Sequence, residues 1–337
     1  MRYVHSALIV LMLVSSACSN GTQTGLAGDN ATPARVAHAL ARPDLAMIQI
    51  AANSCCIVAV DSNLNRIYVS RTADPNGSNT TVVDGSSFSV ATTIAGIGGA
   101  HNVDLKTRNF WLPGLYSGSV SVYSGRSDSQ IATVGLSNCP TDSWIDSTRR
   151  YAWIAAQCGH GSDPVWAVNA DTYKRASGKI RTGGVMGVTV VNPATGKFYV
   201  NNTSGNYEIA PGSFALSPTS FGVAYAADSR TNLIYASAQS NTLNIVDGTT
   251  DGVVTSVALS YSPSAIAVNQ RLNHLYLAHG TNVIDVRDAT SGGAIATIML
   301  GSGSSVISLA PDNRRARIYA AIAVGSQTYL LRVRDKY

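Results

Sequence analysis

Residues 233–248 read LIYASAQSNTLNIVDG, and the rest of the chain follows the pattern of this stretch. An apolar run around Tyr235 leads through a polar turn into a second apolar run that ends at Asp247-Gly248. An apolar run that ends at Asp228 precedes the stretch, and a run rich in Val, Thr and Ala follows it. Short runs of such residues, separated by Asp, Asn, Gly and Ser, predict four strands joined by three turns.

The same unit returns along the chain at intervals of 36 to 48 residues. An aromatic residue marks the second strand of each unit, and a second marker, such as Asp-Gly, closes the third strand. A period of about 40 residues that holds four strands is typical of one blade of a β-propeller. The sequence therefore predicts an all-β fold, a seven-bladed β-propeller of four-stranded blades. The aromatic markers are Tyr68, Trp111, Tyr151, Tyr199, Tyr235, Tyr276 and Tyr319.

The last unit ends after three strands, because Tyr337 closes the chain. An open sheet edge invites aggregation, so an N-terminal strand is expected to complete the last blade and close the ring. Leu45–Ile50 is the candidate for this strand. In the second unit the first strand is expected at His101–Leu105, and His274 is expected in a solvated turn.

Composition supports the all-β assignment and limits the partners. Hydrophobic residues make up 45% of the chain and charged residues only 13%, with a single Glu at position 208, so long amphipathic helices are not expected. The net charge of +5 invites a nucleic-acid partner. However, the basic residues are scattered at turns, such as Arg149-Arg150 and Arg314-Arg315, without interleaved aromatic residues. This pattern predicts solvated arginines and no nucleic-acid partner.

The N-terminus carries the features of an export signal. Arg2 precedes an apolar run at residues 7–14, and Ser15-Ser16-Ala17 provide a small-residue cleavage site. The apolar run is too short to span a bilayer. We expect a signal peptide at 1–17, a flexible tether at 18–44, rich in Gly, Ser, Thr and Asn up to about residue 33, and the propeller at 45–337.

Cys18 directly follows the cleavage site, which resembles the lipobox of bacterial lipoproteins. The resemblance implies that Cys18 is the lipid anchor, and that the protein is a membrane-anchored lipoprotein of the periplasm or cell surface. Ser15 stands where the lipobox prefers Leu, so ordinary cleavage after Ala17 remains an alternative.

The other four cysteines suit an oxidising compartment. Cys139 lies at the start of the first strand of the third unit, and Cys158 lies at the end of the second strand. In an antiparallel pair these ends face each other, so a disulfide between Cys139 and Cys158 is expected. For Cys55 and Cys56, a strained vicinal disulfide and free thiols both remain open. Adjacent cysteines lack the spacing of a zinc site.

The repeats resemble the YVTN family of β-propeller repeats found in exported bacterial and archaeal proteins. Asn192-Pro193 followed by Tyr199-Val200-Asn201-Asn202 is similar to the strand that names the family. Residues 241–247 and 294–298 are similar to its later strands. The resemblance covers residues 57–335. It implies the propeller fold, and it implies little about function, because the repeat residues build blades.

Candidate binding residues lie where a propeller commonly holds its site. In a propeller the first strands line a central channel. The connections between fourth and first strands, and between second and third strands, gather on one face. The repeat places His101, Asp142, His160 and His279 near that face. Imidazoles and a carboxylate suit a transition metal, but their positions on several blades favour separate surface groups. Neither a metal site nor a cofactor is predicted.

Two functional hypotheses follow. The first is a monomeric, non-enzymatic scaffold that binds an envelope protein or a small ligand through this face. No Gly-x-Ser-x-Gly elbow, Walker loop or paired acids are present in the sequence, so no catalytic residue is predicted. The second is a metal-dependent hydrolase similar to propeller lactonases, with its site at the channel mouth. Covalent haem c is excluded because the chain contains no CxxCH motif.

Overall fold

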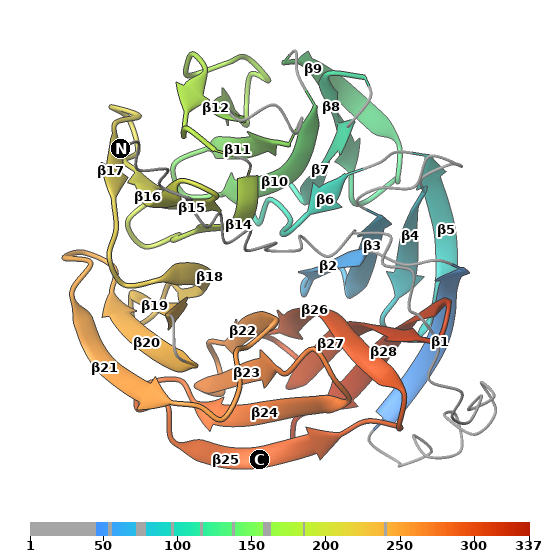
Figure 1. The fold of residues 1–337 in the computed structure, drawn as a ribbon. Helices are drawn as coiled ribbons and strands as arrows, with labels where there is room; N and C mark the ends of the chain where they lie inside the picture. Colours follow the sequence, from blue (N-terminus) through green and yellow to red (C-terminus); the bar gives the residue numbers. More distant parts are fainter. Residues whose placement is uncertain are drawn as a thin grey trace, which may run out of the picture.

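A computed structural model describes residues 45–337, apart from 53–55, 72–78, 96–97, 115–116, 137–138, 158–162, 185 and 239–240. All its regular elements within these residues are strands, and they form seven sheets arranged in a ring (Figure 1). The predicted seven-bladed β-propeller is thus confirmed. The blades, from first to last, comprise β2(Cys56–Asp61) to β5(Ser89–Ala95), β6(Gly99–Ala100) to β9(Gln130–Gly135), β10(Pro140–Asp146) to β13(Ile180–Arg181), β14(Met186–Val191) to β17(Leu216–Pro218), β18(Val223–Asp228) to β21(Val253–Ala258), β22(Ala265–Asn269) to β25(Ala294–Met299), and β26(Ser304–Asp312) to β28(Gln327–Arg334).

The strand predicted to close the ring is also confirmed. β1(Leu45–Ala52) runs antiparallel to β28, with Leu45 opposite Val333, and lies at the outer edge of the last blade (Figure 1). Ala46 and Ile48 pack toward the first blade, while Leu45 and Met47 pack toward the sixth. The closing strand therefore contributes to the hydrophobic contacts on both sides of its blade.

The first strand of the second blade departs from the prediction. Only β6 is a strand, and it pairs in parallel with β10 of the third blade, whereas His101–Asp104 is irregular. Asn102 is one cause, because its side-chain amide donates to the carbonyl of Ile145 (2.9 Å) and accepts from the Ile145 N–H (2.7 Å). The next strand of the second blade, β7(Asn109–Gly114), also bonds to the third blade through a side chain: the carbonyl of Trp111 accepts from the Ser143 hydroxyl (2.7 Å). Side chains thus replace the backbone ladder at this position.

The aromatic markers of the repeat hold neighbouring blades together. Tyr68, Tyr235, Tyr276 and Tyr319 are completely buried. The hydroxyl of Tyr199 in β15(Phe198–Asn202) donates to Asp251 of the next blade (2.8 Å), and the Tyr276 hydroxyl donates to Asp335 of the next blade. The marker that identifies each second strand in the sequence is therefore a contact between blades.

Each first strand, or the irregular segment in its place, ends in a buried Asp or Asn that caps the following turn. The side-chain oxygen of Asp146, for example, accepts the N–H groups of Thr148 and Arg149 (3.0 and 2.9 Å). This bonding satisfies turn donors and explains why Asp and Asn recur at this position. The seven residues are Asp61, Asp104, Asp146, Asn192, Asp228, Asn269 and Asp312, all 0% exposed.

The turns that follow these residues contact one another around the whole ring. We call the face that carries them, together with the turns between third and fourth strands, the turn face, and the opposite face the loop face. Several turn arginines are half-buried and bonded to the neighbouring turn, so the prediction of solvated arginines is wrong for Arg149, Arg150 and Arg315. The contacts join Asp61 to Arg108, Leu105 to Ser147, Arg149 to Pro193, Asn192 to Asn232, Ser229 to Gln270, Arg271 to Arg314, and Arg315 to Ser62.

The C-terminal segment connects the last blade to the sixth blade through a buried polar cluster. His274, the first residue of β23(His274–Ala278), is only 8% exposed, so its predicted place in a solvated turn is wrong. Its Nδ1 lies 2.8 Å from the carboxylate of Asp335, which also accepts the Tyr276 hydroxyl. The Asp335 N–H donates to the carbonyl of Ala316 (2.9 Å). A residue two positions from the end of the chain thus completes a buried polar cluster.

We expect Asp335→Ala to destabilise the protein by about 2–4 kcal/mol, because it leaves two buried polar side chains without their shared acceptor. The free energy of unfolding from urea titration measures the effect. Asp335→Asn is the matched control, because its amide oxygen still accepts the Tyr276 hydroxyl. Equal losses in the two variants would show that the hydrogen bonds are not the cause.

Several predictions concern residues outside the described part of the chain. They are the signal peptide at 1–17, the tether at 18–44, the lipid anchor Cys18, and the candidate His160. The disulfide stays a prediction because Cys158 is among these residues; the Gln157 N–H donates to the carbonyl of Cys139 (3.0 Å). Cys55 is outside as well, whereas Cys56 is the first residue of β2. In the part that is described, no helix has the length and apolar character needed to cross a membrane.

Candidate functional site

The inner strands of the second and third blades place His101 and Asp142 together. Asp142 lies near the start of β10, and His101 follows β6, so both lie toward the loop face. His101 Nε2 is 3.0 Å from Asp142 Oδ1, and the two side chains are 23% and 16% exposed. Gly99 lies opposite Asp142 in the ladder, and a Cβ there would meet Asp142 Oδ1 at 2.5 Å. Glycine at this position therefore leaves the space that the Asp142 carboxylate occupies.

The aromatic ring of Trp144 connects this pair to the fourth blade. The imidazole of His101 stacks on the indole of Trp144, with ring centroids 4.6 Å apart and planes 9° from parallel. Trp144 Nε1 donates to the hydroxyl of Thr189 in β14 (3.0 Å). Trp144 is half-buried, whereas the other three tryptophans are fully buried. His101, Asp142, Trp144 and Thr189 thus form one network across three blades, which we call the inner-strand network.

His279 belongs to a different polar cluster, on the sixth blade. Its ring stacks on Tyr261 (centroids 3.1 Å apart), and its Nε2 lies 3.3 Å from Asp285 in β24(Val283–Asp288). The Tyr261 hydroxyl donates to the same carboxylate (2.6 Å). Burial alone would raise the pKa of Asp285, but hydrogen bonds from Tyr261 and His279 outweigh it and hold the pKa below its usual value. Burial, and then the bond to Asp285, raise the pKa of Tyr261.

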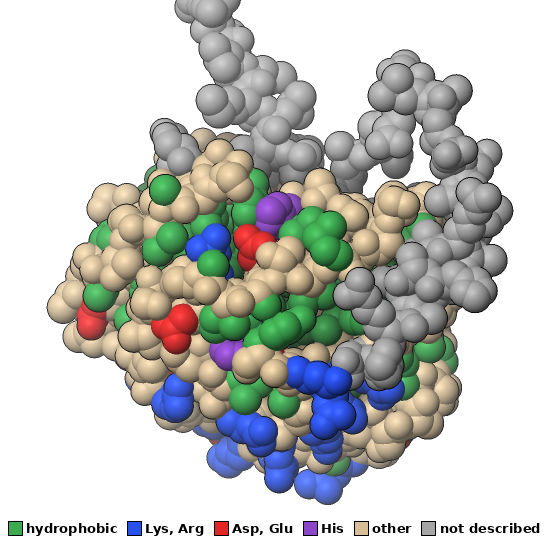
Figure 2. Space-filling view, turned by 90° about the horizontal axis from the view of Figure 1, so that it is seen from below, with side chains coloured by type: hydrophobic (Ala, Val, Ile, Leu, Met, Phe, Trp, Pro, Cys, Tyr) green, Lys and Arg blue, Asp and Glu red, His purple; other side chains and the backbone are tan. Residues whose placement is uncertain are grey.

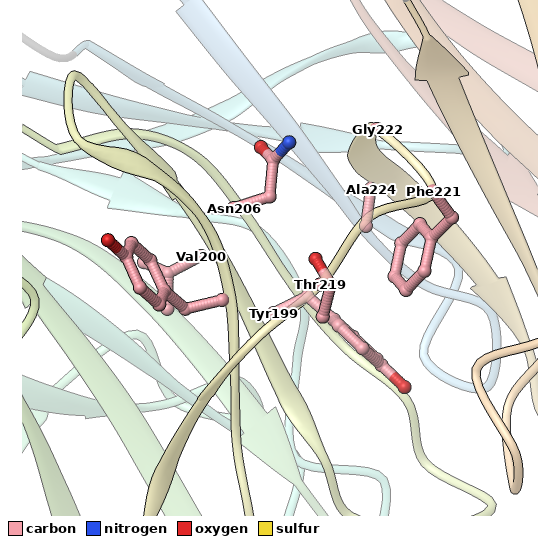
Figure 3. Close-up of a pocket in the computed structure, with 8 residues that line it drawn as sticks. Tyr199, Val200, Asn206, Thr219, Phe221, Gly222 and Ala224 are labelled. Atoms are coloured by element: carbon pink, nitrogen blue, oxygen red, sulfur yellow. The ribbon is translucent and has the colours of Figure 1, made fainter.

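A small crevice opens between the fourth and fifth blades. Figure 3 shows Asn206 on one side of it and Phe221 and Gly222 on the other. The aromatic rings of Tyr199 and Phe221 meet edge to face, with centroids 5.7 Å apart. The crevice is too small to hold a water molecule, whereas ligand pockets commonly measure about 300–1,000 Å³. It therefore lacks the size of a small-molecule site.

The only Glu of the chain forms a second carboxylate cluster that the sequence did not indicate. Lys197 Nζ lies 2.9 Å from Glu208 in β16(Gly205–Ile209) and 2.8 Å from Asp251. Burial and the neighbouring Asp251 raise the pKa of Glu208. Because Asp251 also accepts the Tyr199 hydroxyl, this cluster is part of the contact between the fourth and fifth blades. We assign it a structural role.

Sequence reasoning found part of the site. It named His101 and Asp142, which the structure brings into contact. It also named His279, which contacts Tyr261 and Asp285 on the sixth blade, away from that pair; His160 lies outside the described residues. It missed Trp144, Thr189, Tyr261 and Asp285. Trp144 carried a usable signal, because it is a large aromatic residue two positions after Asp142 on an inner strand. Within the described residues, no group of three or more His, Cys, Asp or Glu side chains is arranged to hold a metal ion.

The comparisons with known proteins give no family. No family model matches the chain, and no curated protein matches it. The fold defines the class of protein: a seven-bladed β-propeller whose ring is closed by its N-terminal strand.

Proposed function

We propose that this chain is an exported, lipid-anchored β-propeller of the YVTN repeat kind. In this proposal it binds an envelope partner through its loop face and catalyses no reaction. The observation that carries the proposal is the inner-strand network, which presents an imidazole, a carboxylate and an aromatic ring on the inner edges of adjacent blades.

The chemistry of the network supports recognition. Aromatic side chains with a polar edge dominate the energy of many binding surfaces, because they bury much area and also direct hydrogen bonds. His101 and Asp142 retain exposed surface, while the bonds to Thr189 and Ile145 hold the surrounding chain rigid. A rigid polar site loses little conformational entropy when it binds, which favours affinity.

Capture from an envelope extract, followed by titration of the captured partner, tests the proposal. We expect His101→Ala to weaken binding at least tenfold, as truncation of a central contact residue does. Lys106→Gln is the control, because Lys106 is exposed on the turn face. Equal affinity of His101→Ala and the wild type for every captured partner would contradict the proposal.

The hydrolase alternative has one observation in its favour, the adjacency of His101 and Asp142 near the channel mouth. It makes a different prediction in a thermal melt. A divalent cation at a hundred times its dissociation constant would stabilise the fold by about 2.7 kcal/mol, and EDTA would reverse the effect. Loss of this stabilisation in Asp142→Asn, together with lactone hydrolysis by the wild type, would favour the alternative over the scaffold.

A further inference from the structure

Basic side chains gather on the turn face at the junction where the ring closes. Figure 2 shows Lys and Arg side chains concentrated along the lower rim of the molecule. The turns and strand ends of the sixth and seventh blades carry seven basic residues at this junction. They are Arg271, Arg314, Arg315, Arg317, Arg332, Arg334 and Lys336. We call these residues the closing-junction cluster.

Two members of the cluster face a neutral acceptor. Arg317 and Arg332 lie on β27(Arg317–Val324) and β28, and both guanidinium groups donate to the carbonyl of Gly85 in the first blade (3.2 and 3.3 Å). Arg332 also lies over the ring of Phe88, with its Cζ 4.4 Å from the ring centroid. Among the described residues, no ion pair joins either arginine to a carboxylate. Burial, and then repulsion from Arg317, lower the pKa of Arg332.

Arg332 is the one residue with a positive charge at its position in the repeat. It pairs with the marker Tyr319. The residues in the same place opposite Tyr68, Tyr235 and Tyr276 are Val82, Ile245 and Val286, whereas Glu208 lies opposite Tyr199. The position therefore accepts apolar side chains and charges of either sign.

The outer members of the cluster are open to solvent. Arg271, Arg314 and Arg334 are exposed. Arg271 donates to the carbonyl of Arg314, and Arg314 donates to the side chain of Asn63, so both acceptors are neutral. The acids beside them, Asp312 and Asp335, are buried and bonded within the protein. The exposed charge at this junction is thus mainly positive.

The N-terminal part of the chain enters the fold at the same place. Leu45, the first described residue, lies opposite Val333, next to Arg334 and on the turn-face end of β28. The sequence before it contains the apolar run at residues 7–14 and Cys18. A chain anchored at Cys18 would therefore leave the membrane and reach the propeller beside the closing-junction cluster.

We propose that the closing-junction cluster docks the turn face onto an anionic lipid surface. This inference rests on the lipid anchoring in the proposed function and adds the orientation of the anchored protein. Arginine near an anionic leaflet gains binding energy from the surface potential, and a basic patch is the usual second signal beside a lipid chain. The loop face, with its inner-strand network, would then point away from the membrane, toward its partner.

Vesicle sedimentation of the full chain carrying Cys18→Ser tests the docking without the lipid anchor. The vesicles contain phosphatidylcholine alone or with phosphatidylglycerol. We expect partitioning only into the anionic vesicles, and we expect salt to weaken it. Each arginine removed should cost about fivefold in the partition constant, so the variant Arg271→Gln/Arg314→Gln/Arg334→Gln should lose roughly a hundredfold. Arg181→Gln, which removes an exposed charge at the loop-face end of β13, is the control and should change nothing.

The outcomes separate this inference from the proposed function. Equal partitioning of the triple variant and Arg181→Gln would overturn the docking, as would equal partitioning into neutral and anionic vesicles. Thermal melts of each variant show whether the fold is retained, and the single exposed variant Arg334→Glu provides a second test if the triple variant melts early. Mass measurement of Cys18 in the wild-type protein tests the lipid anchor independently.

Discussion

Replacing Arg150 by Met is expected to lower the free energy of unfolding by about 3–5 kcal/mol. The side chains of Arg150 and Asp104 are 13% and 1% exposed, and the guanidinium holds the carboxylate through two hydrogen bonds of 2.7 and 2.8 Å. It also bonds to Asp171 (3.0 Å). Without the arginine, a buried carboxylate keeps its desolvation cost and loses its compensating charge. Urea denaturation measures the change.

The loss should depend on pH. Burial would raise the pKa of Asp104, but hydrogen bonds from Arg150 and Thr107 outweigh it and lower the pKa below its ordinary value. A carboxyl group with a depressed pKa in the folded state stabilises the protein above its unfolded pKa of about 3.9, and this contribution disappears as the pH falls through the folded pKa. The difference between wild type and variant should therefore be full at neutral pH and shrink below about pH 4.

The matched control is Arg230→Met, the same substitution at an exposed position of another turn on the same face. It should change the free energy of unfolding by no more than about 0.5 kcal/mol. A similar loss in both variants, or a loss at Arg150 that persists unchanged into acid, would contradict the role assigned to the Asp104 pair.

Placing a charge in the closing strand is the second substitution with a large expected effect. Ile48→Asp should destabilise the protein by about 2–4 kcal/mol, because Ile48 packs into the hydrophobic cluster between the last and first blades. The melting temperature should fall by roughly 5–10 °C. Differential scanning calorimetry measures this shift.

Gln49→Asp introduces the same charge one residue further along β1. Gln49 is exposed and bonds to the side chain of Gln327 (2.6 Å). Since neighbouring strand residues point to opposite faces, this variant should melt within about 2 °C of the wild type. Equal shifts in the two variants would mean that the packing of β1 against the first blade does not hold the ring closed.

The fold could be predicted because the same sequence pattern recurs in every blade. Tyr235 and Tyr276 occupy equivalent buried places, and Asp228 and Asn269 cap equivalent turns, so each blade supports the assignment of the others. The prediction of a strand at His101–Leu105 failed because side-chain hydrogen bonds replace the backbone hydrogen bonds of a strand there. At Asn102 the amide bonds to the next blade in place of a strand, and nothing in the spacing of apolar residues indicates this.

The site was predicted less completely. The repeat gave the strand ends on which His101 and Asp142 lie, and hence their shared face. It could not give the stacking of His101 on Trp144 or the bond from Trp144 to Thr189, because these contacts join three blades across distances of 43 to 45 residues in the chain. Such contacts depend on the rotation between blades, which periodicity within one blade does not determine.

Closure by β1 has a consequence for biosynthesis. The contact between Gln49 and Gln327 spans 278 residues, so the first strand of the described part of the chain pairs with its last strand. At ribosomal speeds of about 5–20 residues per second, β1 waits roughly 15–55 s for its partner. During that interval its edge is open to wrong pairing, and a chain that stops short of β28 never covers it. Synthesis through β28 is thus a precondition for a closed ring.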